Sequence, residues 1–337
     1  MSPPETAAGN EGAAARPEVS VLIANYNNEP FLAEALGSVL DQGIEALEII
    51  VVDDGSTDRS LDIVRDLQAK HPGRIRLFEQ ATKSGPGGAR NRALAEARGQ
   101  WLAVLDGDDL MQPGRLRSLI DQATAAGADI VADDLILFYQ DGAKPPHRHL
   151  GEAWDGYGKP IDAAGYVAEN HFYAKRPTLG YLKPVWRADR WRETGLLYDP
   201  SLRIGEDYDF MLRLLRRGLR FMVAPVAGYR YRRHAASISH RIADSQLAAL
   251  LEADKRLVAT LRPDETALAA VLRDRERSIL DGLAFDAVVV ALKAKNPVAA
   301  AKALLGRPRI LPLLWEPVAV RIARMKASFR PQPSGGV

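Results

Sequence analysis

Short apolar segments alternate with segments of helical periodicity over the first ~135 residues, and this order restricts the fold more than any other feature of the sequence. Each apolar segment is short, and most are rich in β-branched residues, as buried strands are. The expected strands are 19–24, 47–52, 74–79, 101–105 and 129–132. Because short links join them to the helical segments, we expect an α/β fold with an open, mostly parallel, doubly wound sheet.

Polar side chains stand at the carboxyl ends of three of these strands. Asn25 and Tyr26 follow the first strand, Asp53 and Asp54 the second, and residues 106–109 the fourth. In open α/β sheets, ligands bind beyond the carboxyl ends of the strands. We therefore expect the three groups to converge on one ligand-binding rim.

The segment 106–109 (DGDD) places three carboxylates on one turn, where Gly107 is expected to let the backbone bend. Like charges this close are costly unless a cation lies among them. Carboxylates, water and substrate phosphate oxygens are typical ligands of Mg²⁺ or Mn²⁺, so a divalent cation is one interpretation. A solvated turn, or a cap for the following helix, is the other.

Several further charged positions have both a chemical and a structural interpretation. Arg90 follows the glycine-rich residues 85–88 at a helix start, where a guanidinium and backbone N–H groups favour phosphate, although helical arginines are usually solvated. Asp54 can cap the helix that follows the second strand. Glu206 and Asp207 open another helix, where a carboxylate can cap the helix or take a proton from an incoming hydroxyl.

Composition and absent motifs exclude several classes of function. The chain has no cysteine, which removes disulfides, thiolate nucleophiles, zinc–thiolate sites and iron–sulfur clusters. Its net charge is only +2, so there is no global electrostatic case for a nucleic-acid partner, and none is expected. The sequence lacks the G-x-S-x-G, H-E-x-x-H and P-loop motifs, which argues against common hydrolases, zinc proteases and P-loop enzymes.

The two ends of the chain are expected to be disordered, because residues 1–17 and 330–337 are small, polar and proline-containing. Residues 1–17 lack the basic start and apolar core of a signal peptide. No apolar run is long enough for a membrane span. We therefore expect a cytoplasmic protein.

Residues 302–330 are basic, with seven Lys or Arg residues against Glu316 alone, and apolar side chains including Trp315 lie between them. Such a segment can lie in a bilayer interface. It can equally form a helix that packs on the protein with a solvated basic face. Peripheral attachment to a membrane surface is therefore one of two interpretations.

Five motifs occur in one order and at suitable spacings: VSVLIANYN, IIVVDDGSTD, ARNRAL, VLDGDDL and GEDYDF. Together they resemble the inverting GT-A glycosyltransferases of family 2, over about residues 19–235. YLKPV and YDPSLRIGEDYDF most resemble bacterial succinoglycan-type exopolysaccharide glucosyltransferases. The resemblance implies a GT-A domain over 18–238, with a nucleotide-binding half (18–135) and an acceptor and catalytic half (136–238), followed by a helical extension (239–329).

The resemblance also implies roles for the matching positions. Asp207 would be the general base, supported by Glu206. The nucleotide-sugar-binding residues would be Asn25, Tyr26, Asp53, Asp54, Arg90, Asp106, Arg230 and Arg233. The ligands of a divalent cation, Mg²⁺ or Mn²⁺, would be Asp106, Asp108 and His234.

The implied reaction moves a sugar, expected to be glucose, from a UDP-sugar to a hydroxyl of a lipid-linked oligosaccharide or other glycan in exopolysaccharide biosynthesis. A single displacement would give a β-glycoside, and the aromatic loop around His147, Trp154 and Tyr157 would receive the acceptor. The alternative is a catalytically silent relative that binds the nucleotide sugar for regulation or assembly. A receiver domain is less consistent, because its acid pair would follow the first strand.

Overall fold

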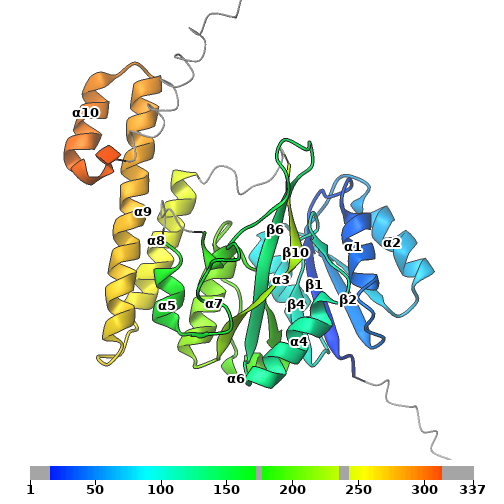
Figure 1. Ribbon diagram of the computed structural model, residues 1–337. Coiled ribbons are helices and arrows are strands. Elements are labelled where there is room, and N and C mark those ends of the chain that lie inside the picture. Colours follow the sequence, from blue (N-terminus) through cyan, green and yellow to red (C-terminus); the bar gives the residue numbers. More distant parts are fainter. Residues whose placement is uncertain (1–15, 172–176, 235–242, 313–337) are drawn as a thin grey trace, which may run out of the picture. The chain divides into compact units, whose positions relative to one another are not determined.

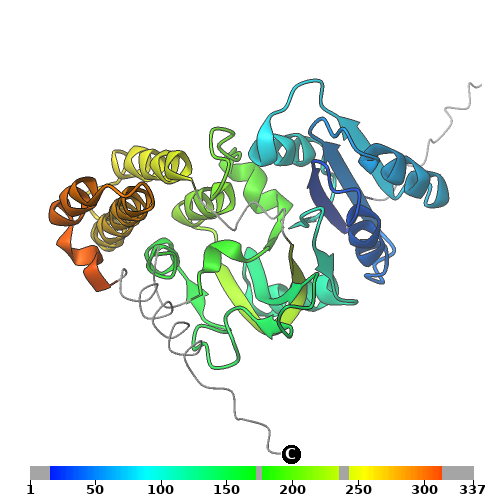
Figure 2. The ribbon, with the colours of Figure 1, turned by 90° about the horizontal axis from the view of Figure 1, so that it is seen from above.

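The computed structural model describes residues 16–171, 177–234 and 243–312. The chain divides into two compact units, one comprising Met1–Asp162 and Tyr181–Ala236, the other Ala163–Gly180 and Ser237–Val337. The first unit holds the sheet and the second is helical (Figures 1 and 2). The tail and nearly all of the leader predicted from the sequence lie outside the described residues. A boundary at residue 238 stays a prediction.

The described strands of the first unit form one sheet (Figure 1). They are β1 (Val19–Asn25), β2 (Leu47–Asp53), β3 (Ile75–Glu79), β4 (Trp101–Val104), β5 (Leu110–Met111), β6 (Ile130–Tyr139), β7 (His147–Arg148), β8 (Pro160–Ile161), β9 (Val185–Arg187) and β10 (Phe221–Arg233). Their main order is β3-β2-β1-β4-β9-β6-β10-β5, with β7 beside β6 and β8 beside β10. β1 to β4 pair in parallel, as do β6 and β10, while β9 runs antiparallel between β4 and β6.

Helices cover both faces of this sheet. They are α1 (Leu32–Leu40), α2 (Ser60–Lys70), α3 (Gly85–Glu96), α4 (Arg115–Ala126), α6 (Ala188–Thr194) and α7 (Glu206–Arg216). α3 packs on β1 and β2 behind the sheet of Figure 1, and α4 packs on β6 and β10 in front of it. Every residue of β2 is buried, as expected for a strand covered on both faces. The predicted mostly parallel sheet with flanking helices is confirmed.

The sequence RFMVA (220–224) also predicts a strand, and in the structure it forms only the first part of β10. Ala224 pairs with Asp133 and Tyr229 pairs with Leu135, so the four residues 225–228 lie opposite the single residue Asp134. Pro225, which has no N–H to donate to the ladder, lies in this bulge. Beyond the bulge, β10 continues beside β6 as far as Arg233.

The chain between β6 and β9 is irregular, as the loss of periodicity over 140–180 predicts. In the described part of the first unit it forms only the short strands β7 and β8, and a 3-10 turn, η1, covers Leu179–Tyr181. β9 was not predicted from the sequence. It has three residues, too few to show a period, and it becomes a strand because it pairs with β4 and β6.

The second unit is built around one long helix. Its described elements are α5 (Ala163–Ala168), α8 (Asp244–Val258), α9 (Thr266–Lys293), α10 (Pro297–Gly306) and the 3-10 turn η3 (Pro308–Ile310). α9 packs against α5, α8 and α10. Near its middle, Ile279 packs on Leu247 and Leu251 of α8, and near its end Val288 packs with Ala300 and Ile310.

A buried ion pair ties the segments of this unit together. Nε of Arg275 on α9 lies 2.9 Å from Oδ2 of Asp254 on α8. Nη1 of Arg275 also donates to the backbone carbonyl of Asn170, which joins the residues after α5 to α9. Within the ranges that the structure describes, no helix is both long and apolar enough to cross a bilayer.

Candidate active site

The first part of the rim forms where β1 and β2 end. Nδ2 of Asn25 and the hydroxyl of Ser56 donate to Oδ2 of Asp53 over 2.7 and 2.6 Å. The backbone amides of Gly55 and Ser56 donate to Oδ1 of Asp53 over 3.1 and 2.8 Å. Both oxygens of Asp53 are thus held by the chain's own donors, and this carboxylate fixes the turn that follows β2. Recognition of a uracil ring by Asp53 stays a prediction.

Asp54, the next residue, serves a different element. Its Oδ1 accepts the backbone amide of Ser84 over 2.7 Å, and its Oδ2 accepts the amide of Gly85 over 2.8 Å. These amides lie at the start of α3, so Asp54 caps α3 and not the helix that follows β2. The capping interpretation from the sequence therefore named the wrong helix. The cap fixes the start of the helix that carries Arg90.

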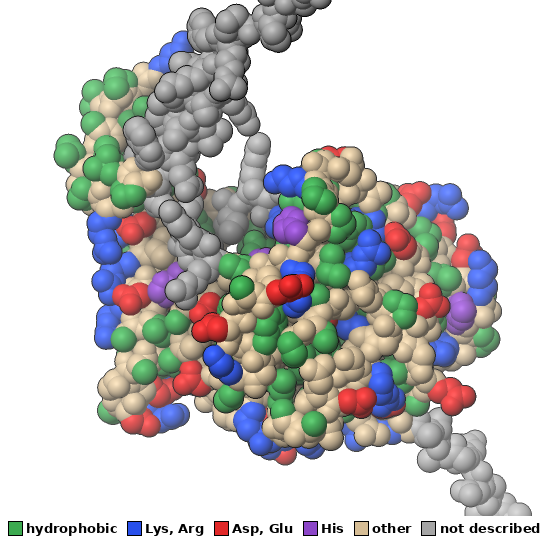
Figure 3. Space-filling model, viewed as in Figure 1, with side chains coloured by type: hydrophobic (Ala, Val, Ile, Leu, Met, Phe, Trp, Pro, Cys, Tyr) green, Lys and Arg blue, Asp and Glu red, His purple; other side chains and the backbone are tan. Residues whose placement is uncertain are grey.

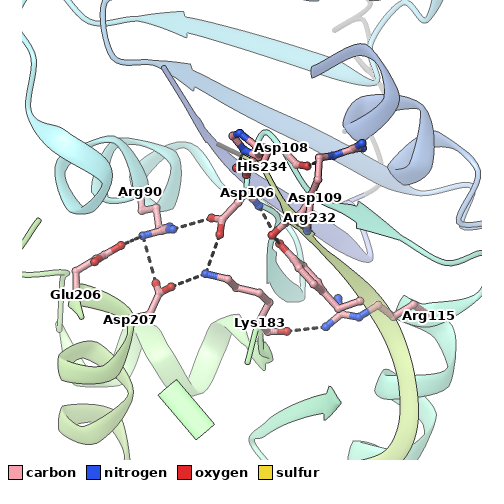
Figure 4. A network of polar contacts seen from close by, with 11 residues as sticks. Arg90, Asp106, Asp108, Asp109, Arg115, Lys183, Glu206, Asp207, Arg232 and His234 are labelled. Carbon is pink, nitrogen blue, oxygen red and sulfur yellow. Dashed lines mark hydrogen bonds and ion pairs between the residues drawn. The ribbon is translucent and has the colours of Figure 1, made fainter. Parts of the chain in front are cut away.

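A charged network joins four segments of the chain (Figure 4). Nη2 of Arg90 lies 2.8 Å from Oδ1 of Asp106, and its Nη1 lies 2.5 Å from Glu206 and 3.2 Å from Asp207. Nζ of Lys183, just before β9, lies 2.8 Å from Oδ2 of Asp106 and 2.7 Å from Oδ2 of Asp207. The same two cations therefore hold a carboxylate from the end of β4 and one from the start of α7.

The network sets the charge of its members. Burial would raise the pKa of the Asp106 carboxyl, but the charges of Lys183 and Arg90 outweigh it and hold this pKa below its usual value. Burial would lower the pKa of Lys183, but Asp106 and Asp207 keep it well above its usual value. The pKa of Glu206 is raised, by burial and then by the charge of Asp207, with Arg90 opposing. Asp106 is thus kept ionised and Lys183 protonated, while Glu206 holds a proton more readily than a solvated glutamate.

Asp108 and His234 form a second polar pair at the same turn. Nε2 of His234 lies 3.0 Å from Oδ2 of Asp108, and the His234 ring packs on Phe31 with centroids 4.6 Å apart. Carboxylate oxygen and imidazole nitrogen are both ligands that Mn²⁺ and similar cations accept. The pair therefore fits a divalent cation as two protein ligands, with water or phosphate oxygens at the remaining positions.

Asp106, the third expected metal ligand, has other partners. Both of its carboxylate oxygens are occupied, one by Arg90 and one by Lys183. Among the residues described, no group of three acidic or histidine side chains could hold a metal ion. Protein cations therefore compensate part of the negative charge of the turn.

The last carboxylate of the turn is buried beneath it. Asp109 accepts the hydroxyl of Tyr229 over 2.9 Å and the backbone amide of Arg232 over 2.7 Å. Burial, together with the charges of Asp108 and Asp106, raises the pKa of Asp109 well above its usual value. The Tyr229 hydroxyl also accepts the amide of Asp106 over 3.2 Å, so Asp109 fixes the turn through β10.

Gly107 is needed for a reason other than the expected bend. It is not among the glycines with a left-handed backbone. A Cβ at this position would lie 2.6 Å from Nδ2 of Asn28 and 3.1 Å from Oδ1 of Asn25. A Cβ here would displace the Asn28 amide, so glycine lets the end of β1 pack against the acidic turn.

Lys183 is a residue of the site that the sequence analysis missed. It occurs in YLKPV, a segment that contributed only to the resemblance. A lysine among apolar residues is a usable signal, because a buried ammonium needs carboxylate partners. Its backbone is also held: Nη2 of Arg115 donates to the Lys183 carbonyl over 2.6 Å and pairs with Asp133 over 2.7 Å, at a fully buried position.

Three more of the expected nucleotide-binding residues, like Asn25, Asp53 and Asp54, lie outside this charged network. Tyr26 is 43% exposed, with Nζ of Lys83 3.7 Å from its ring centroid. The guanidinium of Arg230 lies 4.6 Å from the ring centroid of Phe138, on the strand next to its own. That of Arg233 lies 5.1 Å from the ring centroid of Tyr231. Contacts of these residues with a nucleotide sugar stay predictions.

The aromatic loop expected to receive an acceptor is anchored to β6. Tyr157 donates through its hydroxyl to Oδ2 of the buried Asp134 over 2.9 Å. The Trp154 ring meets the Tyr157 ring edge to face, with centroids 5.0 Å apart. His147 lies on β7 and stacks on Tyr139, with centroids 6.2 Å apart. A sugar-binding role of this loop stays a prediction.

Solved structures share this fold. The chain is similar to S. aureus TarS 1–349 in complex with UDP-GlcNAc, with a TM-score of 0.58 and 16% identity, over 87% of this chain and 92% of that one. It is also similar to the mannosyltransferase PcManGT from Pyrobaculum calidifontis in complex with GDP-Man and Mn²⁺, with a TM-score of 0.57 and 17% identity, over 92% of this chain and 81% of that one. The expected GT-A glycosyltransferase fold is confirmed.

Sequence comparison gives the family. Residues 20–178 match the model described as Glycosyl transferase family 2. The chain is 34% identical to the succinoglycan biosynthesis protein ExoO of Rhizobium meliloti (strain 1021) over 313 residues, which cover 93% of this chain and 88% of that protein. The chain belongs to glycosyl transferase family 2.

Proposed function

We propose that this protein is an inverting glycosyltransferase of exopolysaccharide biosynthesis. It moves a sugar, glucose in our proposal, from a UDP-sugar to a hydroxyl of a lipid-linked oligosaccharide and forms a β-glycosidic bond, which makes it a hexosyltransferase. The similarity to a succinoglycan biosynthesis protein over most of both chains supports the pathway class. The donor and the acceptor follow from the family resemblance of the motifs.

One observation carries the proposal. Asp207, at the first turn of α7, shares Lys183 and Arg90 with Asp106 from the end of β4. The general base must lie close to the cations that stabilise the departing diphosphate. The hydroxyl that loses its proton to the base attacks the same sugar carbon that the diphosphate leaves. These contacts supply that proximity within a single compact unit.

The chain's own residues account for the main steps. Asp207 takes the proton of the acceptor hydroxyl as its oxygen attacks the anomeric carbon. Arg90 and Lys183 are fixed cations, and in this position they stabilise the negative charge that grows on the departing diphosphate. Glu206 pairs with Arg90 over 2.5 Å and orients it. Because a single displacement reverses the anomeric configuration, an α-linked donor gives a β-linked product.

A divalent cation fits the pair formed by Asp108 and His234. When bound there, it would supply further positive charge for the diphosphate oxygens. The GT-A neighbour PcManGT, which was solved with Mn²⁺, supports this cofactor. Asn25 and Asp53 form the rim at the ends of β1 and β2, and we propose that these two residues and Tyr26 hold the nucleoside there.

We also propose that transfer takes place at the cytoplasmic face of the membrane, since a lipid-linked acceptor is held there. Of the basic segment 302–330 that suggested this location, residues 313–330 lie outside the described residues. The described part, residues 302–312, covers the end of α10 and the turn η3, and it includes Lys302, Arg307 and Arg309.

Replacing Asp207 by asparagine tests the proposal. Loss of a general base lowers the rate about 10²- to 10⁴-fold, so sugar transfer from UDP-glucose should fall by that factor. The affinity for UDP, measured by calorimetry, should be unchanged. Asp209→Asn is a matched control, because this carboxylate lies on the same helix and pairs with Arg213 instead.

Two results would contradict the proposal. A fully active Asp207→Asn variant would remove Asp207 as the base. An unmodified protein that binds UDP but transfers no sugar from any UDP-sugar offered, to any lipid-linked acceptor, would favour the catalytically silent alternative.

A further inference from the structure

α10 has apolar side chains on both of its sides, and only one side is covered. Ala300 is buried against Val288 of α9 and Ile310 of η3. On the opposite side, Val298 and Leu305 are 77% and 81% exposed. A helix that is apolar all round is expected to be covered all round.

The uncovered side of α10 forms an open groove. Residues 298, 301, 302 and 305 follow the spacing of one helical face and line this groove of about 490 Å³ together with Pro297. Val290 and Leu292 at the end of α9 and Leu311 after η3 are also exposed, so five large apolar side chains of these elements are 55% to 81% exposed. Figure 3 shows hydrophobic side chains gathered over α10.

The charges around this surface have one sign. Residues 287–312 contain five basic side chains and no acidic one. Arg307 pairs with Asp281 over 2.9 Å. The other four, Lys293, Lys295, Lys302 and Arg309, are exposed, and none forms an ion pair with a residue that the structure describes. The exposed apolar side chains thus lie on the same elements as exposed basic side chains, of which Lys293 also interacts with the charge of Asp286.

We propose that this surface, formed by the end of α9 together with α10 and η3, docks on an anionic lipid bilayer. Apolar side chains enter the acyl boundary of the bilayer while lysine and arginine side chains reach its acidic headgroups. A second copy of this chain fits less well, because a two-fold contact would bring eight exposed cations together, and lysine is depleted at protein interfaces. This inference assigns residues to the membrane location proposed above, and it does not depend on the transfer chemistry.

Vesicle binding by the full chain, without substrate, tests this proposal. The protein should sediment with vesicles of phosphatidylcholine and phosphatidylglycerol and stay in solution with vesicles of phosphatidylcholine alone. Val298→Ser/Leu305→Ser should weaken binding at least about tenfold, since two apolar side chains no longer enter the bilayer. Lys295→Gln/Lys302→Gln should weaken it about fivefold per lysine.

Matched controls come from the first unit. Leu197→Ser/Val226→Ser changes two exposed apolar residues there, and Lys70→Gln/Lys159→Gln removes two exposed lysines. Both should bind vesicles like the unmodified protein. All variants should keep the unmodified melting temperature and the same transfer rate to a detergent-dispersed acceptor, which separates docking from catalysis.

Three results would overturn the proposal. One is an unmodified protein that does not bind anionic vesicles. Another is a Val298→Ser/Leu305→Ser variant that binds them equally well. The third is a dimer in light scattering that this variant converts to a monomer, which would assign the surface to a second copy of the chain.

Discussion

Replacing Lys183 by methionine tests whether one buried cation holds the two carboxylates of the site. The Lys183 side chain is 7% exposed, and its Nζ lies 2.8 Å from Asp106 and 2.7 Å from Asp207. Methionine fills similar space without charge, so both carboxylates are left with Arg90, which already pairs with Glu206. Removing one partner of a buried ion pair costs about 3–5 kcal/mol. That is a large part of the about 5–15 kcal/mol by which a domain is stable.

Urea unfolding followed by circular dichroism measures this loss. Lys255→Met is the control, because Lys255 pairs with Glu252 at an exposed site where the side chains are 51% and 60% accessible. The control should change the free energy of unfolding by at most about 1 kcal/mol. Lys183→Met/Asp207→Asn also removes one of the two carboxylates that lose Lys183, so it should recover part of the loss, with a coupling of about 0.5–3 kcal/mol.

Either of two outcomes would contradict this role of Lys183. In one, Lys183→Met costs less than about 1 kcal/mol at an unchanged denaturant slope, as an exposed pair would. In the other, the effects of the two single substitutions add without coupling. The double variant also covers the case in which Lys183→Met alone does not fold.

Three further outcomes are expected. Asp54→Ala removes the cap of α3 and should cost about 0.5–2 kcal/mol of unfolding free energy; an unchanged melting temperature would contradict the cap. Asp108→Ala removes one of two proposed metal ligands and should lower the Mn²⁺ affinity, measured by calorimetry, at least about tenfold, and equal affinity would exclude that role. Burial, and then the charge of Arg275, hold the pKa of His171 below its usual 6.5. Because the folded protein favours the neutral ring, stability should fall as the pH drops below 6.5, and His171→Gln should abolish that dependence, as followed by urea unfolding at several pH values.

The strands β1, β2 and β4 could be predicted because they are almost wholly buried and therefore read as nearly continuous apolar runs. β2 is the clearest case, with seven buried residues in succession. β9 could not be predicted in the same way, because three residues show no period and its pairing depends on β4 and β6. The second half of β10 reads YRYRR after a proline and a glycine, and both residues suggest a turn when the partner strand is unknown.

The carboxylates of the site could be predicted because they end strands or begin a helix, and those positions are visible in the sequence. Their partners could not. Lys183 does not follow the end of a strand. Its position depends on its own backbone carbonyl, which accepts a hydrogen bond from Arg115 on α4. Asp54 was recognisable as a capping residue, but which helix it caps is decided by the packing of α3 on β2.

The bulge in β10 separates two registers of one strand. Ala224 pairs with Asp133 and Tyr229 pairs with Leu135, and the four residues between them lie opposite Asp134 alone, so their number can change without moving either pair. A slip of Tyr229 by one residue against β6 would instead turn it away from Asp109 and bring Arg230 into its place. Variants of 225–228 should therefore tolerate many changes of residue type and length, while a change that shifts the pairing beyond the bulge would release the acidic turn from beneath.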